Sequence, residues 1–218
     1  MNSGSILVSN RLLVARRAQF HVRQGMASTA EANVEKRVKR RDPVRTKARI
    51  LAAAVEVFTE YGYTQAGLRD IAARADVASS LPVKYFGTKA ALFEAALIDI
   101  VRANSVFTWK KERFGETMVR LIRDRSNVAI TAMLMMALSD PESRAVAIRV
   151  WREHMIAPLA EWLGPPDAKG RADTLFALLS GLTFQIHGLA DGEVSPAALR
   201  WAASTLQALV DEGEKRLT

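Results

Sequence analysis

The chain has 218 residues, of which 49% are hydrophobic and 25% are charged. A chain of this length and composition can bury a sizeable core without disulfide bonds. It contains no cysteine, which excludes a disulfide framework, a thiolate zinc site and a cysteine nucleophile. No stretch of the sequence reaches the roughly 18 consecutive apolar residues that a membrane-spanning helix needs, so we expect no membrane partner.

The formal net charge of +8 comes from one end of the chain. Residues 1–49 contain 12 basic and three acidic residues, whereas residues 50–218 contain 19 basic and 20 acidic residues. Such an asymmetry predicts contact with a polyanion, which is either nucleic acid or an anionic membrane surface. The alternative interpretation is a solvated tail without a partner.

We expect residues 1–41 to form a disordered basic arm, within which Met26 is an alternative start of the protein. Eight basic residues lie in the run that ends at Arg49, directly before and inside the first strong helical pattern. Arg45 and Lys47 belong to this run. They are candidates for contact with the phosphates of double-stranded DNA or with its minor groove.

The rest of the chain has the pattern of an all-α protein with about nine helices. Alternating apolar runs are missing, and glycine and proline divide the chain into segments of helical length. The expected helices lie near residues 43–61, 68–75, 78–85, 89–110, 116–125, 127–139, 141–163, 168–189 and 196–213.

Polar residues at the starts of these segments predict helix N-caps, because their side chains can accept hydrogen bonds from the first free backbone N–H groups. Gly62 is expected to end the first helix, and Pro158 is expected to kink or split the helix over 141–163. The predicted caps are Asp42, Thr88, Asp140, Asp167 and Ser195.

Two short helices joined by a tight turn follow the first long helix, and this order indicates a helix-turn-helix arrangement. The second short helix, from Ala78 with Ser79 as its N-cap, presents small and polar residues that suit the major groove of DNA. Lys84 adds a positive charge to this helix. Lys89, at the start of the next helix, can reach a phosphate.

The segment RILAAAVEVFTEYGYTQAGLRDIAARADVASSLPVKYFGTKAALFEAAL resembles the DNA-binding domain of the tetracycline-repressor (TetR) family. The resemblance implies a three-helix DNA-binding domain over residues 42–88, followed by a larger helical domain over residues 89–218 that binds an effector and dimerises. The matching positions are Ile50, Ala53, Ala54, Phe58, Gly62, Tyr63, Leu68, Ile71, Ala72, Ala75, Val77, Tyr85, Phe86, Lys89, Leu92 and Phe93.

By resemblance, Arg69 touches a base or a phosphate, and Lys89 is the lysine that opens the fourth helix. The alternative for Arg69 is a surface ion pair with Asp70 or another neighbouring acidic residue. The groove-facing positions are Ser79, Ser80 and Leu81, and the backbone-contacting positions are Lys84 and Tyr85. For Leu81 and Tyr85 the alternative role is packing.

Four positions depart from the family pattern. Gly67 stands where the family often has a capping Thr or Ser, and Asp76 replaces a common turn glycine. Val83 stands where a phosphate-binding tyrosine is frequent. Pro82 is tolerated in a first helical turn but biases the residue before it away from helical geometry, so the recognition helix is expected to begin late or to be distorted.

The resemblance also implies that the last two helices form a homodimer interface. Small residues at 177, 180, 181, 202 and 203 would permit close approach of helices, and ordinary packing within one chain is the alternative. Methionine and aromatic side chains indicate a cavity for a small, largely apolar effector, although such residues are more often simply core. The candidate pocket residues are Trp109, Met133, Met136, Trp151, Met155 and Phe184.

The three histidines show no metal-ligand spacing, and neither a cofactor nor a catalytic motif is evident, so we expect no enzyme activity. The sequence favours a cytoplasmic, nucleoid-associated bacterial regulator that acts as a homodimer on a palindromic operator, most simply as a ligand-responsive repressor. The alternative is a helical dimeric protein that binds a partner or a membrane surface and has only nonspecific affinity for DNA.

Overall fold

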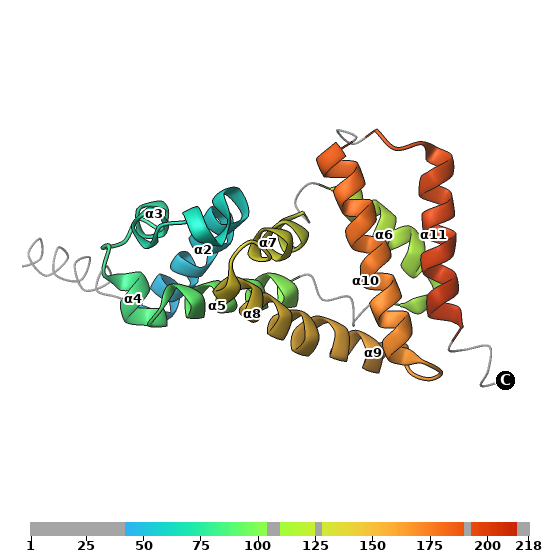
Figure 1. The fold of residues 1–218 in the computed structure, drawn as a ribbon, viewed down its shortest axis with the longest axis horizontal. Coiled ribbons are helices and arrows are strands. Elements are labelled where there is room, and N and C mark those ends of the chain that lie inside the picture. The colour runs from blue at the N-terminus through green and yellow to red at the C-terminus, as the bar shows by residue number, and fades with distance from the viewer. Residues whose placement is uncertain (1–41, 104–109, 125–127, 190–192, 213–218) are drawn as a thin grey trace, which may run out of the picture. The chain divides into compact units, whose positions relative to one another are not determined.

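The computed structural model describes residues 42–103, 110–124, 128–189 and 193–212. The chain divides after Thr46 into two parts. Within the described residues every regular element is a helix, which confirms the all-α prediction, and each of the nine expected segments overlaps at least one helix (Figure 1). The α-helices are α2 (Pro43–Gln65), α3 (Leu68–Arg74), α4 (Leu81–Phe86), α5 (Lys89–Ala103), α6 (Phe114–Arg123), α7 (Ala129–Ala137), α8 (Pro141–Val150), α9 (Ala157–Leu163), α10 (Ala168–Phe184) and α11 (Pro196–Asp211).

Within the described residues, three short helices of other types adjoin these elements. A 3₁₀ helix, η1 (Lys111–Arg113), leads into α6, and a π-helix, η4 (Gln185–Leu189), extends α10. A second π-helix, η3 (Trp151–Ile156), separates α8 from α9 and ends directly before Ala157 and Pro158. The split expected at Pro158 is therefore a widened helical turn, which accommodates a residue that has no N–H to donate.

The predicted caps form at all five helix starts. The Asp42 carboxylate accepts hydrogen bonds from the N–H groups of Val44 and Arg45 at 3.0 and 3.1 Å. The Thr88 hydroxyl accepts one from Ala91 at 3.0 Å. The same role is played by Asp140 for α8, Asp167 for α10 and Ser195 for α11.

Gly62 has φ of 70° and ψ of 174°, so it leaves helical geometry as expected. The prediction that the first helix stops at Tyr61 is nevertheless short by one turn, because the backbone resumes helical geometry after the kink and ends at Gln65.

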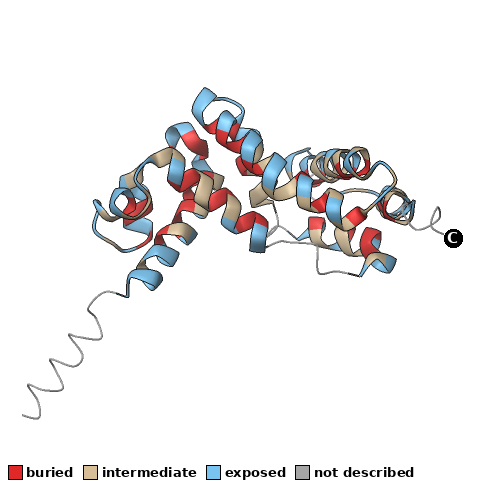
Figure 2. Ribbon diagram, turned by 90° about the horizontal axis from the view of Figure 1, so that it is seen from below, coloured by how far each residue is buried: buried red, intermediate tan, exposed pale blue. Residues whose placement is uncertain are grey.

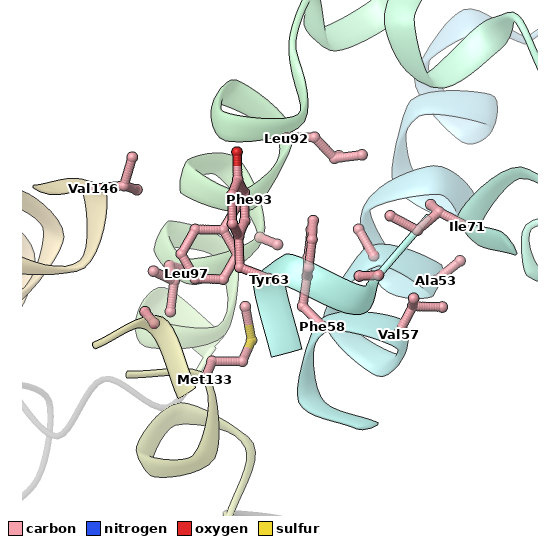
Figure 3. Packing of buried hydrophobic residues seen from close by; sticks show 14 of the residues in the cluster. Ala53, Val57, Phe58, Tyr63, Ile71, Leu92, Phe93, Leu97, Met133 and Val146 are labelled. Carbon is pink, nitrogen blue, oxygen red and sulfur yellow. The ribbon is translucent and has the colours of Figure 1, made fainter. Parts of the chain in front are cut away.

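The first hydrophobic core gathers residues from α2, α3, α5, α7 and α8 (Figure 3). The rings of Phe58, Tyr63 and Phe93 meet there, with centroids 5.0 to 6.1 Å apart. Met133 of α7 and Val146 of α8 close the same core. The apolar packing that supports the short helices α3 and α4 therefore continues into α7 and α8.

The second core is built by α6, α9, α10 and α11, with the Phe114 and Trp162 rings 5.2 Å apart. Buried and exposed residues alternate along these helices at helical spacing, as Figure 2 shows by colour. A Cβ atom on Gly115 would overlap the backbone carbonyl of Ala203, so α6 and α11 cross closely within one chain. The backbone of Ala203, a residue expected at the dimer interface, therefore also contacts α6 within the chain.

Candidate nucleic-acid interface

The turn between α3 and α4 is held from α2. Ala75 ends α3, and Asp76 adopts the left-handed conformation with φ of 49° in place of a turn glycine. The Arg49 guanidinium donates to the carbonyls of Ala75 and Asp76 at 2.5 and 2.8 Å and to the Asp76 carboxylate at 2.9 Å. This basic residue therefore fixes the angle between the two short helices.

Helix α4 begins three residues later than the sequence pattern predicts. Ser80 is the N-cap residue, not Ser79, and Pro82 is a buried residue in the first turn. The Leu81 amide already donates to the Ala78 carbonyl at 2.9 Å, so residues 78–80 form a turn ahead of the helix. The expectation that Pro82 delays the recognition helix is confirmed.

The outward face of this turn and of α4 is small and polar. Ser79, Ser80 and Lys84 are exposed, and so is Val83. Leu81 and Tyr85 are partly buried and pack against the first core, which is their alternative role.

Three further basic candidates lie on α2 and α3. Arg69 is exposed on α3, and within the described residues it has no ion pair or hydrogen bond, not even with the neighbouring Asp70. The Lys47 ammonium lies 5.3 Å from the centre of the Phe86 ring, which ties α2 to α4 by a cation–π contact. Arg45 is exposed in the short part of the chain before Lys47.

Lys89 points toward the protein rather than toward solvent. Its ammonium lies 4.7 Å from the centre of the Tyr63 ring and donates to the Thr64 carbonyl at 3.3 Å. Burial lowers the pKa of Lys89, an effect that the carboxylates of Asp140 and Glu142 oppose. A phosphate contact would require this ammonium to leave its present partners.

Gly62 and Tyr63, near the end of α2, contact the hairpin formed by α7 and α8. The Tyr63 hydroxyl donates a hydrogen bond to the Glu142 carboxylate in the first turn of α8. Burial, and secondarily this hydrogen bond, raises the pKa of Tyr63. Met136 of α7 packs over Gly62, where a Cβ atom would lie 2.8 Å from its methyl group. The sequence pattern gave no sign of this connection.

A cavity of about 240 Å³ lies between α7, α8 and α10, and Trp151 lines it together with Leu134 and Phe176. Among the described residues, Trp151 is the one predicted pocket residue in its wall. Met133 is fully buried in the first core and Met155 packs against it, so neither lines this cavity.

Two further pocket candidates lie outside the wall of this cavity. Met136 covers Gly62, and Phe184 is 46% exposed on α10. Trp109 lies outside the described residues. The spacing of methionine and aromatic residues in the sequence predicted apolar helix faces. Most of these faces pack against other helices rather than lining a cavity.

The part of the chain that the structure describes holds no group of three acidic or histidine residues placed to bind a metal ion. The His187 ring contacts the Ile122 carbonyl, 2.5 Å from Nε2, so this histidine joins α6 to η4. Among the same residues, no helix combines the length and the apolar character needed to cross a membrane.

Two short helices at a fixed turn, with an exposed small and polar face, define a helix-turn-helix protein that carries further helices. The sequence matches two family models that agree with this class. A model described as bacterial regulatory proteins, tetR family, matches residues 50–96, and one described as Tetracyclin repressor-like, C-terminal domain, matches residues 112–210. The chain belongs to the TetR family and is a DNA-binding transcriptional regulator.

Solved structures have the same fold. GusR from Salmonella enterica is 22% identical, with 81% of this chain and 99% of GusR covered and a TM-score of 0.60. A TetR-family regulator from Rhodococcus sp. is 20% identical over 78% of this chain and 98% of its own, with a TM-score of 0.62. The multidrug binding protein EbrR, in complex with ethidium, is 27% identical over 75% and 98% of the two chains, with a TM-score of 0.55. No curated protein sequence matches the chain.

Proposed function

We propose that the protein is a ligand-responsive repressor that binds a near-palindromic operator as a homodimer. Each protomer inserts the exposed face of α4 into the major groove, with the two half-sites about one helical turn apart. The protein acts by binding rather than by catalysis, in the cytoplasm where the nucleoid lies. The observation that carries the proposal is the helix-turn-helix surface, on which residues 78–80, Lys84 and Arg69 are exposed and Arg69 has no ion pair among the residues that the structure describes.

The expected DNA contacts divide into two kinds. Ser79, Ser80 and Arg69 face the bases, because their side chains are exposed where the short helices meet. The basic residues Lys47 and Lys84 bind phosphates and position the helix. Arg45 and Lys89 are phosphate contacts too, Lys89 after release from Tyr63, while the exposed parts of Leu81 and Tyr85 add contacts from α4.

The homodimer forms through an exposed apolar face on α10 and α11. Trp201 is 67% exposed, and Phe184 and Leu189 are also largely exposed. Between α10 and α11 lies a hollow of about 220 Å³ whose wall includes Gly181 and Trp201. A second copy of the same face would bury these side chains, as a two-fold symmetric interface requires.

Ligand response requires a state with low affinity for DNA that the effector binds better. The hairpin of α7 and α8 is the element we assign to this role, because Met136 and Glu142 contact the end of α2 on one side and the cavity lies on the other. EbrR, which is 27% identical, was solved with ethidium bound, and this likeness supports a small-molecule effector.

The dimer is tested with Gly181→Glu, a position where the structure has open space and a new side chain leaves the protomer intact. Analytical ultracentrifugation should give dimers for the wild type and monomers for the variant. The variant should also bind operator DNA at least about 100-fold more weakly, because two linked half-site contacts become independent. Ala157→Glu, on the exposed side of α9, is the control, and a dimeric Gly181→Glu protein would refute the interface.

A further inference from the structure

A groove of about 630 Å³ lies between α6 and α11, and it shares no residue with the cavity that Trp151 lines. Arg123 at the end of α6 and Pro196 at the start of α11 both line the groove, so the two helices run antiparallel. At the other end of the pair, the Gly115 amide donates to the Gln207 side chain at 3.0 Å, so the helices are in contact there. The groove follows the helix pair from near this contact to the end of α6.

The wall of the groove combines apolar surface with positive charge. Val119 is only 8% exposed, and Leu199 and Ala203 are partly buried, so apolar side chains line its inner part. Three exposed arginines, contributed by both helices, line the same groove: Arg120, Arg123 and Arg200. Such a wall suits a ligand that has one apolar and one anionic part.

The positive charges of the groove are not matched within it. Two acidic residues line the groove, Glu116 and Asp124. Glu116 already accepts hydrogen bonds from Nε and Nη2 of Arg113, at 3.1 and 2.7 Å, and Asp124 also has an interaction of its own. Among the residues that the structure describes, the three arginines of the groove form no ion pair or hydrogen bond. Their guanidinium donors are therefore available to an anion.

We propose that this groove binds a small amphipathic anion, a carboxylate or a phosphate ester that carries an apolar ring. Guanidinium groups donate pairs of parallel hydrogen bonds to both kinds of anion. The apolar part of the wall binds the ring, which leaves water on binding. None of the lining residues is a proposed DNA contact, so the site does not depend on the proposed function.

The groove stays open when the proposed dimer forms. Leu199 and Ala203 lie two residues before and after Trp201, and two residues correspond to about 200° around an α-helix. The groove and the exposed Trp201 face are therefore on opposite sides of α11. The groove shares no residue with the hollow beside Trp201, so an anion and a second copy of the chain do not compete for the same surface.

The test titrates the full chain, without DNA, with 1-naphthyl phosphate at about pH 7.5, where a phosphate ester is largely a dianion. Calorimetry at about 50 mM salt follows binding. Inorganic phosphate is the anion without a ring, and 1-naphthol is the ring without a charge. We expect saturable binding of the ester and at least about 10-fold weaker binding of inorganic phosphate, which buries no apolar surface.

Two variants locate the ester in the groove. Arg120→Gln and Arg200→Gln each remove one guanidinium group, and exposed positions tolerate such changes. Each should weaken ester binding by about 10-fold or more, because a charge-assisted hydrogen bond is lost. The uncharged 1-naphthol should bind both variants as it binds the wild type. Arg152→Gln, which removes the same charge from an exposed position of η3, should leave ester binding unchanged.

Absence of ester binding, or equally tight binding of inorganic phosphate, would overturn the proposal. So would an ester affinity that Arg120→Gln and Arg200→Gln leave unchanged, because the ester would then bind elsewhere. An equal loss in Arg152→Gln would show that net charge attracts the ester, and an equal loss for 1-naphthol would show that the arginines do not act through charge. Either result would overturn the proposal, as would conversion of dimers into monomers by Arg200→Gln, which would assign the groove to a protein interface.

Discussion

Arg171 is a buried charged residue, 4% exposed, that the sequence pattern did not single out. Its guanidinium donates hydrogen bonds to the carbonyls of Leu163 and Gly164 at the end of α9 and of Leu209 and Val210 near the end of α11. It also donates to the Pro166 carbonyl at 2.9 Å. A positive charge at two helix C-termini satisfies carbonyls that have no partner within their own helices.

Replacing Arg171 with methionine should lower the free energy of unfolding by about 3 kcal/mol, because the buried carbonyls lose charge-assisted hydrogen bonds while the aliphatic volume is kept. Urea unfolding measures the change. Arg152→Met, at an exposed position of η3, is the control and should change stability by less than about 0.5 kcal/mol. Equal effects of the two substitutions would show that Arg171 does not hold the helix ends together.

The Tyr63 hydroxyl makes stability depend on alkaline pH. Its pKa is raised in the folded protein, first by burial and then by the hydrogen bond to Glu142, whereas an unfolded tyrosine ionises near pH 10. A raised folded pKa contributes stability that is fully present below about pH 10 and is lost as the pH rises further.

Between pH 8 and pH 11 the wild type should therefore lose about 1 kcal/mol more stability than Tyr63→Phe, which cannot ionise at this position. Urea unfolding at the two pH values gives the difference. Tyr85→Phe removes a hydroxyl that has no hydrogen bond within the described residues and should behave as the wild type does. An equal loss of stability in the wild type and in Tyr63→Phe would show that ionisation of Tyr63 does not cause the pH dependence.

At the scale of elements, the hairpin of α7 and α8 is held so that its turn faces α2. The Asp140 carboxylate caps α8, accepting from the amides of Glu142 and Ser143. The buried Ser143 hydroxyl donates to the Ala137 carbonyl at 3.0 Å and thereby joins the end of α7 to α8. Glu142 is fixed in the first turn of α8, where it accepts the hydrogen bond from Tyr63.

Tyr63→Phe should loosen this turn without unfolding the protein. We expect amide hydrogen exchange to become about 10-fold faster over residues 143–148, because a hydrogen bond to a charged group contributes roughly 1.5 kcal/mol. Exchange in α10 should not change. Mass spectrometry of the full chain measures both regions, and unaltered exchange over 143–148 would show that Tyr63 and α8 are not coupled.

The sequence predicted elements best where one residue decides the local geometry. Asp42, Thr88 and Ser195 each cap a helix because a side-chain oxygen lies beside free amides, a local effect. The start of α4 was predicted three residues too early, because residues 78–80 form a turn ahead of the helix and Pro82 is buried in its first turn. The residue at which α4 begins depends on tertiary packing, which the local sequence does not determine.

For the whole molecule, periodicity predicted which helix faces are apolar but not which partners they have. Met133 and Trp151 both lie on apolar faces, yet one fills the first core and the other lines a cavity. Likewise the inward position of Lys89 follows from the placement of Tyr63, which is 26 residues away along the chain. Cavities and such contacts depend on how the helices are rotated about their axes, and this rotation is a tertiary property.

The central claim is that the exposed surface of α3 and α4 binds a specific DNA sequence. Its most direct test is sequencing of the genomic fragments that the purified full chain retains at about 150 mM salt, repeated with Arg69→Ala and with the control Arg144→Ala. We predict a shared near-palindrome that is retained by the wild type and by Arg144→Ala and is lost or weakened about 10-fold or more with Arg69→Ala. Retention without sequence preference that disappears as salt is raised would contradict the claim, because the basic arm would then be the sole contact with DNA.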